Sequence, residues 1–262
     1  MSQNAYDKND ILFNKFSNLK RSLNKESLLY SLLPWEIIKN GSVADLGCGE
    51  GWFCREIIDN GSPNQVIGID ISKNLINNAK ELNKEKYKNL KYIITDLDSF
   101  ELNEFGIDSI IGSIDFIFSS FLTHYLSDLE SFFNKVYKLL KSNNGSSFIF
   151  FTEHPMRTST KCIENKFIDH KFEGDEIVKK VWPIANYNEQ GKRIFSWLGS
   201  NNIIKYHYTI ETYINTLIKV GFKIDYLGEL NINERQLQFS NNGDLVIESN
   251  RPYSLLIKVS KN

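Results

Sequence analysis

The chain has 262 residues, of which 41% are hydrophobic, and its 31 Lys and Arg residues nearly balance its 32 Asp and Glu residues. This composition favours one large globular domain, and a formal net charge of -1 without a basic block argues against nucleic acid as a partner. Three scattered cysteines do not suit a disulfide framework, which favours a cytoplasmic protein. No stretch approaches the roughly 20 apolar residues of a membrane span, so we expect no membrane partner. We expect a monomer or a homodimer.

Short apolar runs alternate with helical patterns through the first part of the chain. Helices are expected to begin near Trp52, Asn74 and Asp128, the last with its apolar residues on one face. This alternation is typical of βαβ units, which build a parallel sheet with helices on both of its faces. The strands expected in this part cover residues 43–46, 65–70, 91–95, 115–120 and 147–152.

The remaining segments flank a core that we place at residues 41–152, and they complete a single domain. Residues 1–40 are mostly helical in pattern and are expected to fold over the ligand-binding edge of the sheet as a cap. Residues 153–208 contain several turn signals, which predict an insertion after the fifth strand. Residues 209–262 should form a helix that ends at Gly221, followed by two strands at 222–230 and 253–259.

The strongest motif is a glycine-rich turn after the first expected strand, with the sequence VADLGCGEGW at 43–52. Glycines let the backbone turn sharply and approach a ligand, and open α/β sheets bind ligands beyond the carboxyl ends of their strands. Asp70 ends the next strand 21 residues after Gly49, a spacing at which a carboxylate accepts hydrogen bonds from ribose hydroxyls. The turn and Asp70 together predict a cofactor that contains a nucleoside.

Asp45 bears on which class of cofactor this turn binds. A dinucleotide would place its pyrophosphate on the turn, where the carboxylate of Asp45, just before Gly47, would repel it and would attract a cationic group instead. The spacing Gly-x-Gly-x-Gly also differs from the Gly-x-Gly-x-x-Gly of dinucleotide sites. The sequence therefore favours a cationic nucleoside over a nicotinamide dinucleotide.

These features resemble motif I of the class I S-adenosylmethionine-dependent methyltransferases, with VADLGCGEGWF at 43–53 as the matching run. The resemblance implies a Rossmann-like α/β fold, in which a seven-stranded and mostly parallel sheet has an antiparallel last strand. It implies S-adenosylmethionine as the cofactor, with Asp70 on the ribose, Asp96 and Leu97 near the adenine, and Tyr6 closing over the site. The cofactor-binding residues expected in this way are Tyr6, Asp45, Gly47, Cys48, Gly49, Asp70, Ile71, Asp96, Leu97 and Ser119.

Three further runs resemble a bacterial subgroup of small-molecule methyltransferases, which is similar to methyltransferase type 11. These runs are NAYD at 4–7, EHP at 153–155 and KYHYTIETYINTLIKVGF at 205–222. Because residues 1–40 and the insertion at 153–208 flank an otherwise standard core, we expect both segments to close over the substrate. The sequence departs from the subgroup in NRPYSLLIKV at 250–259 and in the polar stretch 231–250.

Four side chains are candidates for the chemical step. His124 follows the fourth expected strand, Glu153 and His154 follow the fifth, and His207 precedes the late helix. A phenol or alcohol acceptor needs a general base, for which a histidine with a pKa near about 6.5 is suited, whereas a carboxylate acceptor needs none. Each candidate also has a structural alternative as a cap or loop residue, and the histidines lack the paired spacing of metal ligands, so no metal site is expected.

We therefore expect an enzyme that methylates an oxygen or nitrogen atom of a small molecule, such as an aromatic or heterocyclic metabolite. The alternatives are a methyltransferase that acts on a protein side chain or a transfer RNA, and a non-catalytic module that binds the cofactor. A nicotinamide-dependent oxidoreductase is a fourth hypothesis, which rests on the glycine turn alone.

Overall fold

The computed structural model describes residues 27–83, 86–104, 106–142, 145–160, 168–171, 178–181, 184–197, 200–231 and 251–261. Most of the expected cap at 1–40, including Tyr6, lies outside the described residues. Its described part forms two short helices, α3 (Leu28–Leu32) and α4 (Trp35–Ile38), which are separated at Pro34. Proline accounts for this break because it disfavours helical geometry in the residue before it.

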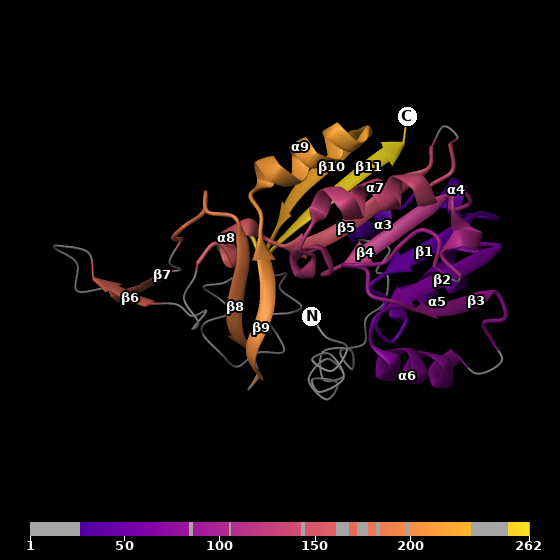
Figure 1. Ribbon diagram of the computed structural model, residues 1–262, viewed down its shortest axis with the longest axis horizontal. Coiled ribbons are helices and arrows are strands. Elements are labelled where there is room, and N and C mark those ends of the chain that lie inside the picture. The colour runs from indigo at the N-terminus through magenta and orange to yellow at the C-terminus, as the bar shows by residue number, and fades with distance from the viewer. Residues whose placement is uncertain are drawn as a thin grey trace.

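A seven-stranded sheet forms the centre of the molecule, and its strands run in the order β10-β11-β5-β4-β1-β2-β3 (Figure 1). Its first five strands along the chain pair in parallel, whereas β11 is antiparallel to both of its neighbours, β5 and β10. The expected Rossmann-like sheet is confirmed. The strands are β1 (Ser42–Leu46), β2 (Gln65–Asp70), β3 (Leu90–Ile94), β4 (Phe116–Ser120), β5 (Ser147–Glu153), β10 (Phe222–Leu230) and β11 (Ser254–Lys261).

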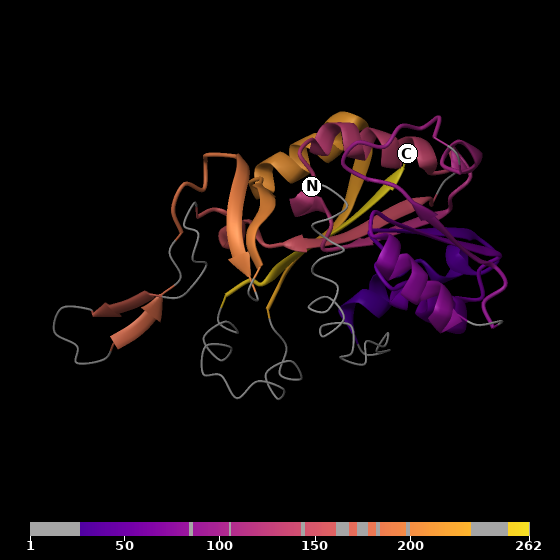
Figure 2. The same cartoon turned by 60° about the horizontal axis from the view of Figure 1, so that its bottom comes forward.

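Helices cover both faces of the sheet (Figure 2). On one face, α5 (Trp52–Gly61) and α6 (Lys73–Asn83) pack in a buried cluster that includes Phe53, Ile57 and Phe118. On the other face, α7 (Leu129–Leu139) and α9 (Ile210–Val220) pack in a second cluster with Phe133 and Leu217 at its centre. Two separate apolar clusters form because alternate strand residues point to opposite faces of the sheet.

The helix ends follow the capping signals of the sequence. Asp128 accepts a hydrogen bond from the Ser131 N–H and so caps α7, while Thr209 caps α9 through the N–H of Thr212. Gly221 ends α9 with a φ of 109°, a left-handed conformation that glycine adopts without strain. Because β4 pairs in parallel with β1, its carboxyl end, which precedes α7, lies at the same edge of the sheet as the glycine turn.

The chain between β5 and α9 leaves the sheet. It forms the short helix α8 (Pro155–Thr158) and two antiparallel hairpins, one of β6 (Ile168–Lys171) with β7 (Val178–Val181) and one of β8 (Gly191–Trp197) with β9 (Ser200–His207). The β6–β7 hairpin lies at the opposite end of the molecule from β3 in both ribbon views (Figures 1 and 2). The β8–β9 hairpin returns to the carboxyl edge of the sheet and contacts α8.

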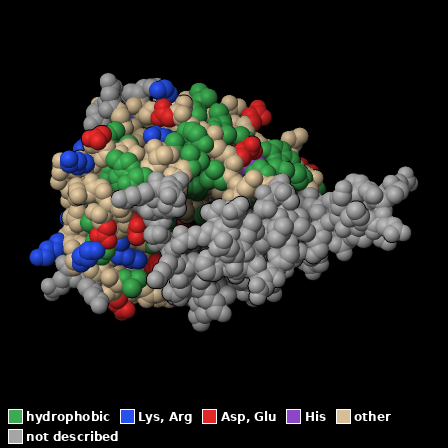
Figure 3. Space-filling view, turned by 180° about the vertical axis from the view of Figure 1, so that it is seen from behind, with side chains coloured by type: hydrophobic (Ala, Val, Ile, Leu, Met, Phe, Trp, Pro, Cys, Tyr) green, Lys and Arg blue, Asp and Glu red, His purple; other side chains and the backbone are tan. Residues whose placement is uncertain are grey.

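The described surface mixes apolar and charged side chains. On the face shown in Figure 3, hydrophobic patches are interspersed with side chains of both charges. None of the helices in the described part of the chain combines the length and the apolar composition that crossing a membrane requires.

Candidate functional site

The glycine turn after β1 is built on backbone conformations that favour glycine. Gly47, Gly49 and Gly51 have φ values of 77°, 54° and 73°. The N–H of Gly49 donates to Oδ2 of Asp70 at 2.8 Å, and the N–H of Ser72 donates to Oδ1 at 2.9 Å. Asp70 thus connects the glycine turn to the end of β2.

The three glycines differ in what surrounds them. A Cβ added to Gly47 would lie 3.3 Å from Leu122, and one added to Gly51 would collide with the Tyr92 hydroxyl. Among the described residues, the nearest neighbour of a Cβ added to Gly49 would be Leu75 Cδ1, at 4.0 Å. Gly47 and Gly51 therefore allow close packing of the protein, whereas the backbone of Gly49 is open to a ligand.

Asp45 lies beside Asp70 because β1 and β2 pair with Asp45 opposite Gly68. The side chain is buried, and the Cys54 thiol donates to its Oδ2 at 3.5 Å. Burial raises the pKa of Asp45 to about 8, the Cys54 hydrogen bond lowers it, and the nearby Asp70 charge raises it further. The two expected carboxylates therefore share one edge of the sheet, although Asp45 is held in its neutral form by burial.

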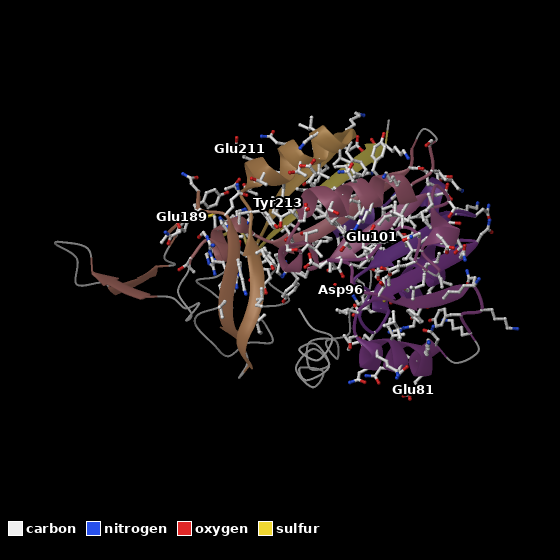
Figure 4. All side chains as sticks on the ribbon, in the orientation of Figure 1. Glu81, Asp96, Glu101, Glu189, Glu211 and Tyr213 are labelled. Carbon is white, nitrogen blue, oxygen red and sulfur yellow. The ribbon has the colours of Figure 1, made fainter. Side chains whose placement is uncertain are left out.

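The other expected cofactor residues surround the same edge. Ile71 follows Asp70 and is half-buried, and Leu97 belongs to the core. Asp96 follows β3, remains half-buried, and accepts the N–H of Asp98 at 3.0 Å (Figure 4). Ser119 donates its hydroxyl to the carbonyl of Leu46 at 2.7 Å and so ties β4 to β1.

Cys48 lies inside the glycine turn. It is buried, and its thiol is 3.7 Å from the carbonyl oxygen of Gly49, while a Cβ on Gly68 would lie only 2.9 Å from its sulfur. Burial, together with nearby thiol and carboxyl groups, holds the pKa of the Cys48 thiol well above its usual range. The side chain therefore packs the turn against β2 as a neutral thiol.

A buried ionic network lies at the end of β5. Glu153 is 9% exposed, and its two oxygens are held by Arg157 Nε at 3.3 Å and by Lys205 Nζ at 2.7 Å. Burial alone would raise the pKa of Glu153, but the charges of Lys205 and Arg157 outweigh it and hold the pKa well below its ordinary value. Glu153 is therefore ionised, and it anchors β9 and α8 to the sheet.

His124 adjoins this network. It lies in the 3-10 helix η2 (Thr123–Tyr125), is 3% exposed, and its Nδ1 accepts the N–H of Glu153 at 3.3 Å and lies 3.2 Å from the Thr152 hydroxyl. Burial lowers the pKa of His124 to about 3, with Glu153 opposing this shift and Lys205 adding to it. The ring is therefore neutral, and because Nδ1 accepts, its proton lies on Nε2.

The other two candidate histidines, His154 and His207, have structural roles in this structure. His154 caps α8 through Nδ1, which accepts the N–H of Met156 at 3.2 Å, and its Nε2 lies 2.8 Å from Glu229 Oε1. His207 contacts the Thr158 hydroxyl through Nδ1 and the carbonyl of Tyr187 through Nε2, both at 2.8 Å. Both ring nitrogens are occupied in each case, so neither histidine presents a lone pair for the expected role as a general base.

Three residues of this region were not singled out from the sequence. Lys205 alternates with His207 along β9, and Arg157 follows Glu153 by one helical turn, but a charged residue at either position usually faces water. Phe121 directly follows β4 with a φ of 56°, is 40% exposed, and its ring lies edge-on to His124. Backbone strain of this kind at a bulky residue is concentrated at functional sites.

Comparison with known proteins identifies the class. A family model described as a methyltransferase domain matches residues 37–195, so the chain belongs to this methyltransferase family. A solved S-adenosylmethionine-dependent methyltransferase from Mesorhizobium loti is 29% identical, with a TM-score of 0.71 over 88% of this chain and 94% of that one. One from Listeria monocytogenes, called putative, is also 29% identical, with a TM-score of 0.72 over 89% of this chain and 95% of that one.

Curated relatives match shorter stretches. Phosphoethanolamine N-methyltransferase 2 of Caenorhabditis elegans is 33% identical over 101 residues, which are 38% of this chain and 21% of that protein. A malonyl-[acyl-carrier protein] O-methyltransferase of Acetivibrio thermocellus is 23% identical over 189 residues, 68% of this chain and 63% of that protein. The family match and the fold together make the protein a class I methyltransferase that uses S-adenosylmethionine.

Proposed function

We propose that the glycine turn, Asp70 and the segment around Asp96 hold S-adenosylmethionine at the carboxyl edge of the sheet. The backbone at Gly49 supports this assignment, because among the described residues no side chain comes closer than 4.0 Å to the place of its missing Cβ. The place of Asp70 at the end of β2, 21 residues after Gly49, suits a carboxylate that binds ribose hydroxyls, and the partly exposed Ile71 suits the adenine ring. When bound, the cofactor supplies a methyl group on a positively charged sulfur.

The methyl acceptor in this proposal is an oxygen or nitrogen atom of a small metabolite, with an aromatic or heterocyclic compound as the first candidate. The observation that carries it is the meeting of β5, η2 and β9 beside the glycine turn, where Glu153, His124 and Lys205 form one buried group. The segment at 153–208 then covers the substrate. A covered site excludes water and aligns a small acceptor, which is most of what methyl transfer requires.

The hydrogen-bonding state of Glu153 and His124 indicates which kind of methyl acceptor the site suits. Glu153 is held by two cations, and His124 uses its lone pair within the protein. An acceptor that is already nucleophilic, such as a carboxylate oxygen or an uncharged amine, is therefore favoured over an alcohol. The names of the two curated relatives describe an N-methyltransferase and an O-methyltransferase, which is consistent with either atom.

The proposal is tested in two steps. Isothermal titration with S-adenosylmethionine and with S-adenosylhomocysteine measures cofactor binding, and Asp70→Ala should weaken this binding at least about tenfold. Transfer from methyl-labelled cofactor to a metabolite extract, a protein extract and total RNA then identifies the acceptor class. Label confined to the low-molecular-mass fraction supports the proposal, whereas label in protein or RNA contradicts the small-molecule acceptor.

A further inference from the structure

The buried network beside the glycine turn contains more hydrogen-bond donors than acceptors. The ammonium group of Lys205 has three N–H donors, yet among the described residues its hydrogen-bond acceptor is Glu153 Oε2 alone. The ammonium otherwise faces aromatic rings, with Phe195 at 5.2 Å and Tyr125 at 5.9 Å from Nζ to the ring centroid. Because Lys205 is 8% exposed, water solvates these remaining donors poorly.

His124 adds a second donor of the same kind. Its Nδ1 is fixed as an acceptor by the backbone of Glu153, which leaves the proton on Nε2. Within the part of the chain that the structure describes, no residue hydrogen-bonds to Nε2. The described residues thus offer this N–H no acceptor, so a ligand that reaches the largely buried ring can accept a hydrogen bond from it.

The acceptors of the region are already engaged. Both carboxylate oxygens of Glu153 are in ion pairs, and the hydroxyls of Thr152 and Tyr213 contact each other at 3.3 Å. A donor group on a ligand would compete at Glu153 with the guanidinium and ammonium groups that already bind its oxygens. A ligand with anionic oxygens would instead meet a cation and an N–H in an environment of low polarity, where charge-assisted hydrogen bonds are strong.

We propose that Lys205 and His124 bind an anionic oxygen group of the methyl acceptor, either a carboxylate or a phosphate. The inference rests on the proposed function, because it takes this region as the substrate site. Leu122, two residues before His124, would contact a Cβ on Gly47, so the anion site adjoins the turn that holds the cofactor. The exposed ring of Phe121 then offers an apolar contact for the rest of the substrate.

The direct probe is the Nε2 nitrogen of His124. The protein has four histidines, so labelling them with nitrogen-15 gives few signals, and the His124→Asn variant assigns the one of interest. Acetate and inorganic phosphate are titrated into the full chain with S-adenosylhomocysteine bound, at ionic strength held constant with sodium chloride. Acetamide, which has the shape of acetate without its charge, is the control ligand.

Variants separate specific binding from a general salt effect. Lys205→Met removes the cation and should weaken anion binding about tenfold or more. Lys141→Met removes the same charge from an ion pair with Asp115, a residue that precedes β4 at the opposite edge of the sheet, and should leave the affinity unchanged. His124→Asn keeps an acceptor for the Glu153 N–H but loses the distal donor, whereas His124→Gln can present an N–H near the position of Nε2.

We expect a saturable shift of the Nε2 signal with an anion, weakened in Lys205→Met and retained in Lys141→Met. Anion affinity should also fall more in His124→Asn than in His124→Gln, and this comparison tests the inference if Lys205→Met does not fold. The two His124 variants lack the Nε2 signal, so their anion binding is measured by the shift of the unfolding midpoint of the cofactor-bound protein. Saturation by phosphate alone indicates a phosphate-bearing substrate, and saturation by acetate alone indicates a carboxylate. The inference is wrong if neither anion binds, if acetamide binds equally well, or if the variants that fold match the wild type.

Failure of this inference is distinguishable from failure of the proposed function. The same samples are titrated with S-adenosylhomocysteine before any anion is added. Cofactor binding without anion binding overturns only the anion site. Absence of cofactor binding overturns the assignment of the glycine turn, whatever the anions do.

Discussion

Replacing Gly49 with alanine tests whether the cofactor approaches the backbone of the glycine turn. Of the residues that the structure describes, the nearest to the added Cβ is Leu75, with Cδ1 at 4.0 Å, so these residues leave room for the methyl group. The φ of 54° places the alanine in the left-handed region, which costs about 1 kcal/mol. For a domain of this size, that loss lowers the unfolding midpoint by about 2–4 °C.

The matched control is Gly112→Ala. Gly112 has a φ of 62°, and a Cβ there would have nothing within 4 Å, so this variant has the same backbone strain at a position away from the sheet's ligand edge. Calorimetric unfolding of the two variants should therefore give similar midpoints. The comparison separates backbone strain from any effect on the ligand.

Only Gly49→Ala should lose affinity for S-adenosylhomocysteine. A methyl group forced into a packed contact costs about 1–3 kcal/mol. The dissociation constant of S-adenosylhomocysteine, measured by isothermal titration, should therefore rise about 5- to 150-fold. Gly112→Ala should bind as the wild type does. An unchanged affinity in Gly49→Ala, or an equal loss in both variants, would refute the reasoning that a ligand lies against this backbone.

Three further outcomes follow from the same region. Asp70→Ala should weaken the binding of S-adenosylhomocysteine at least about tenfold in isothermal titration, because the Gly49 N–H and the ribose both lose their acceptor. Binding as tight as that of the wild type would contradict this role of Asp70. Burial raises the pKa of Asp45 from 3.8 to about 8, so between these two pH values the folded protein holds a proton that the unfolded chain has lost. The free energy of unfolding should therefore fall as the pH rises through this window. Denaturant unfolding of Asp45→Asn should lack that part of the slope, and parallel curves for the two proteins would count against a protonated Asp45. His154→Asn keeps an acceptor for the Met156 N–H but loses the contact with Glu229, so it should lower stability by about 1 kcal/mol while the pH profile of methyl transfer stays unshifted. A shifted profile would restore His154 as a base.

The sheet, its helices and the glycine turn were predictable from the sequence because they depend on neighbouring residues. Alternating apolar residues mark the strands, and glycines at 47, 49 and 51 supply the left-handed conformations that the turn requires. Asp128, Thr209 and Gly221 cap helices within a few residues of themselves. These local signals predicted a parallel α/β core with a nucleoside-binding turn, and the resemblance of residues 43–53 to motif I implied the methyltransferase class.

The tertiary structure decided the chemical state of the site. Glu153 and Lys205 are 52 residues apart in sequence, and the backbone of Glu153 fixes the tautomer of His124 from 29 residues away. Whether a carboxylate is ionised or a histidine keeps a free lone pair depends on burial and on such distant partners. A residue's own sequence neighbours do not carry that information, which is why His154 and His207 looked like bases and Lys205 went unnoticed.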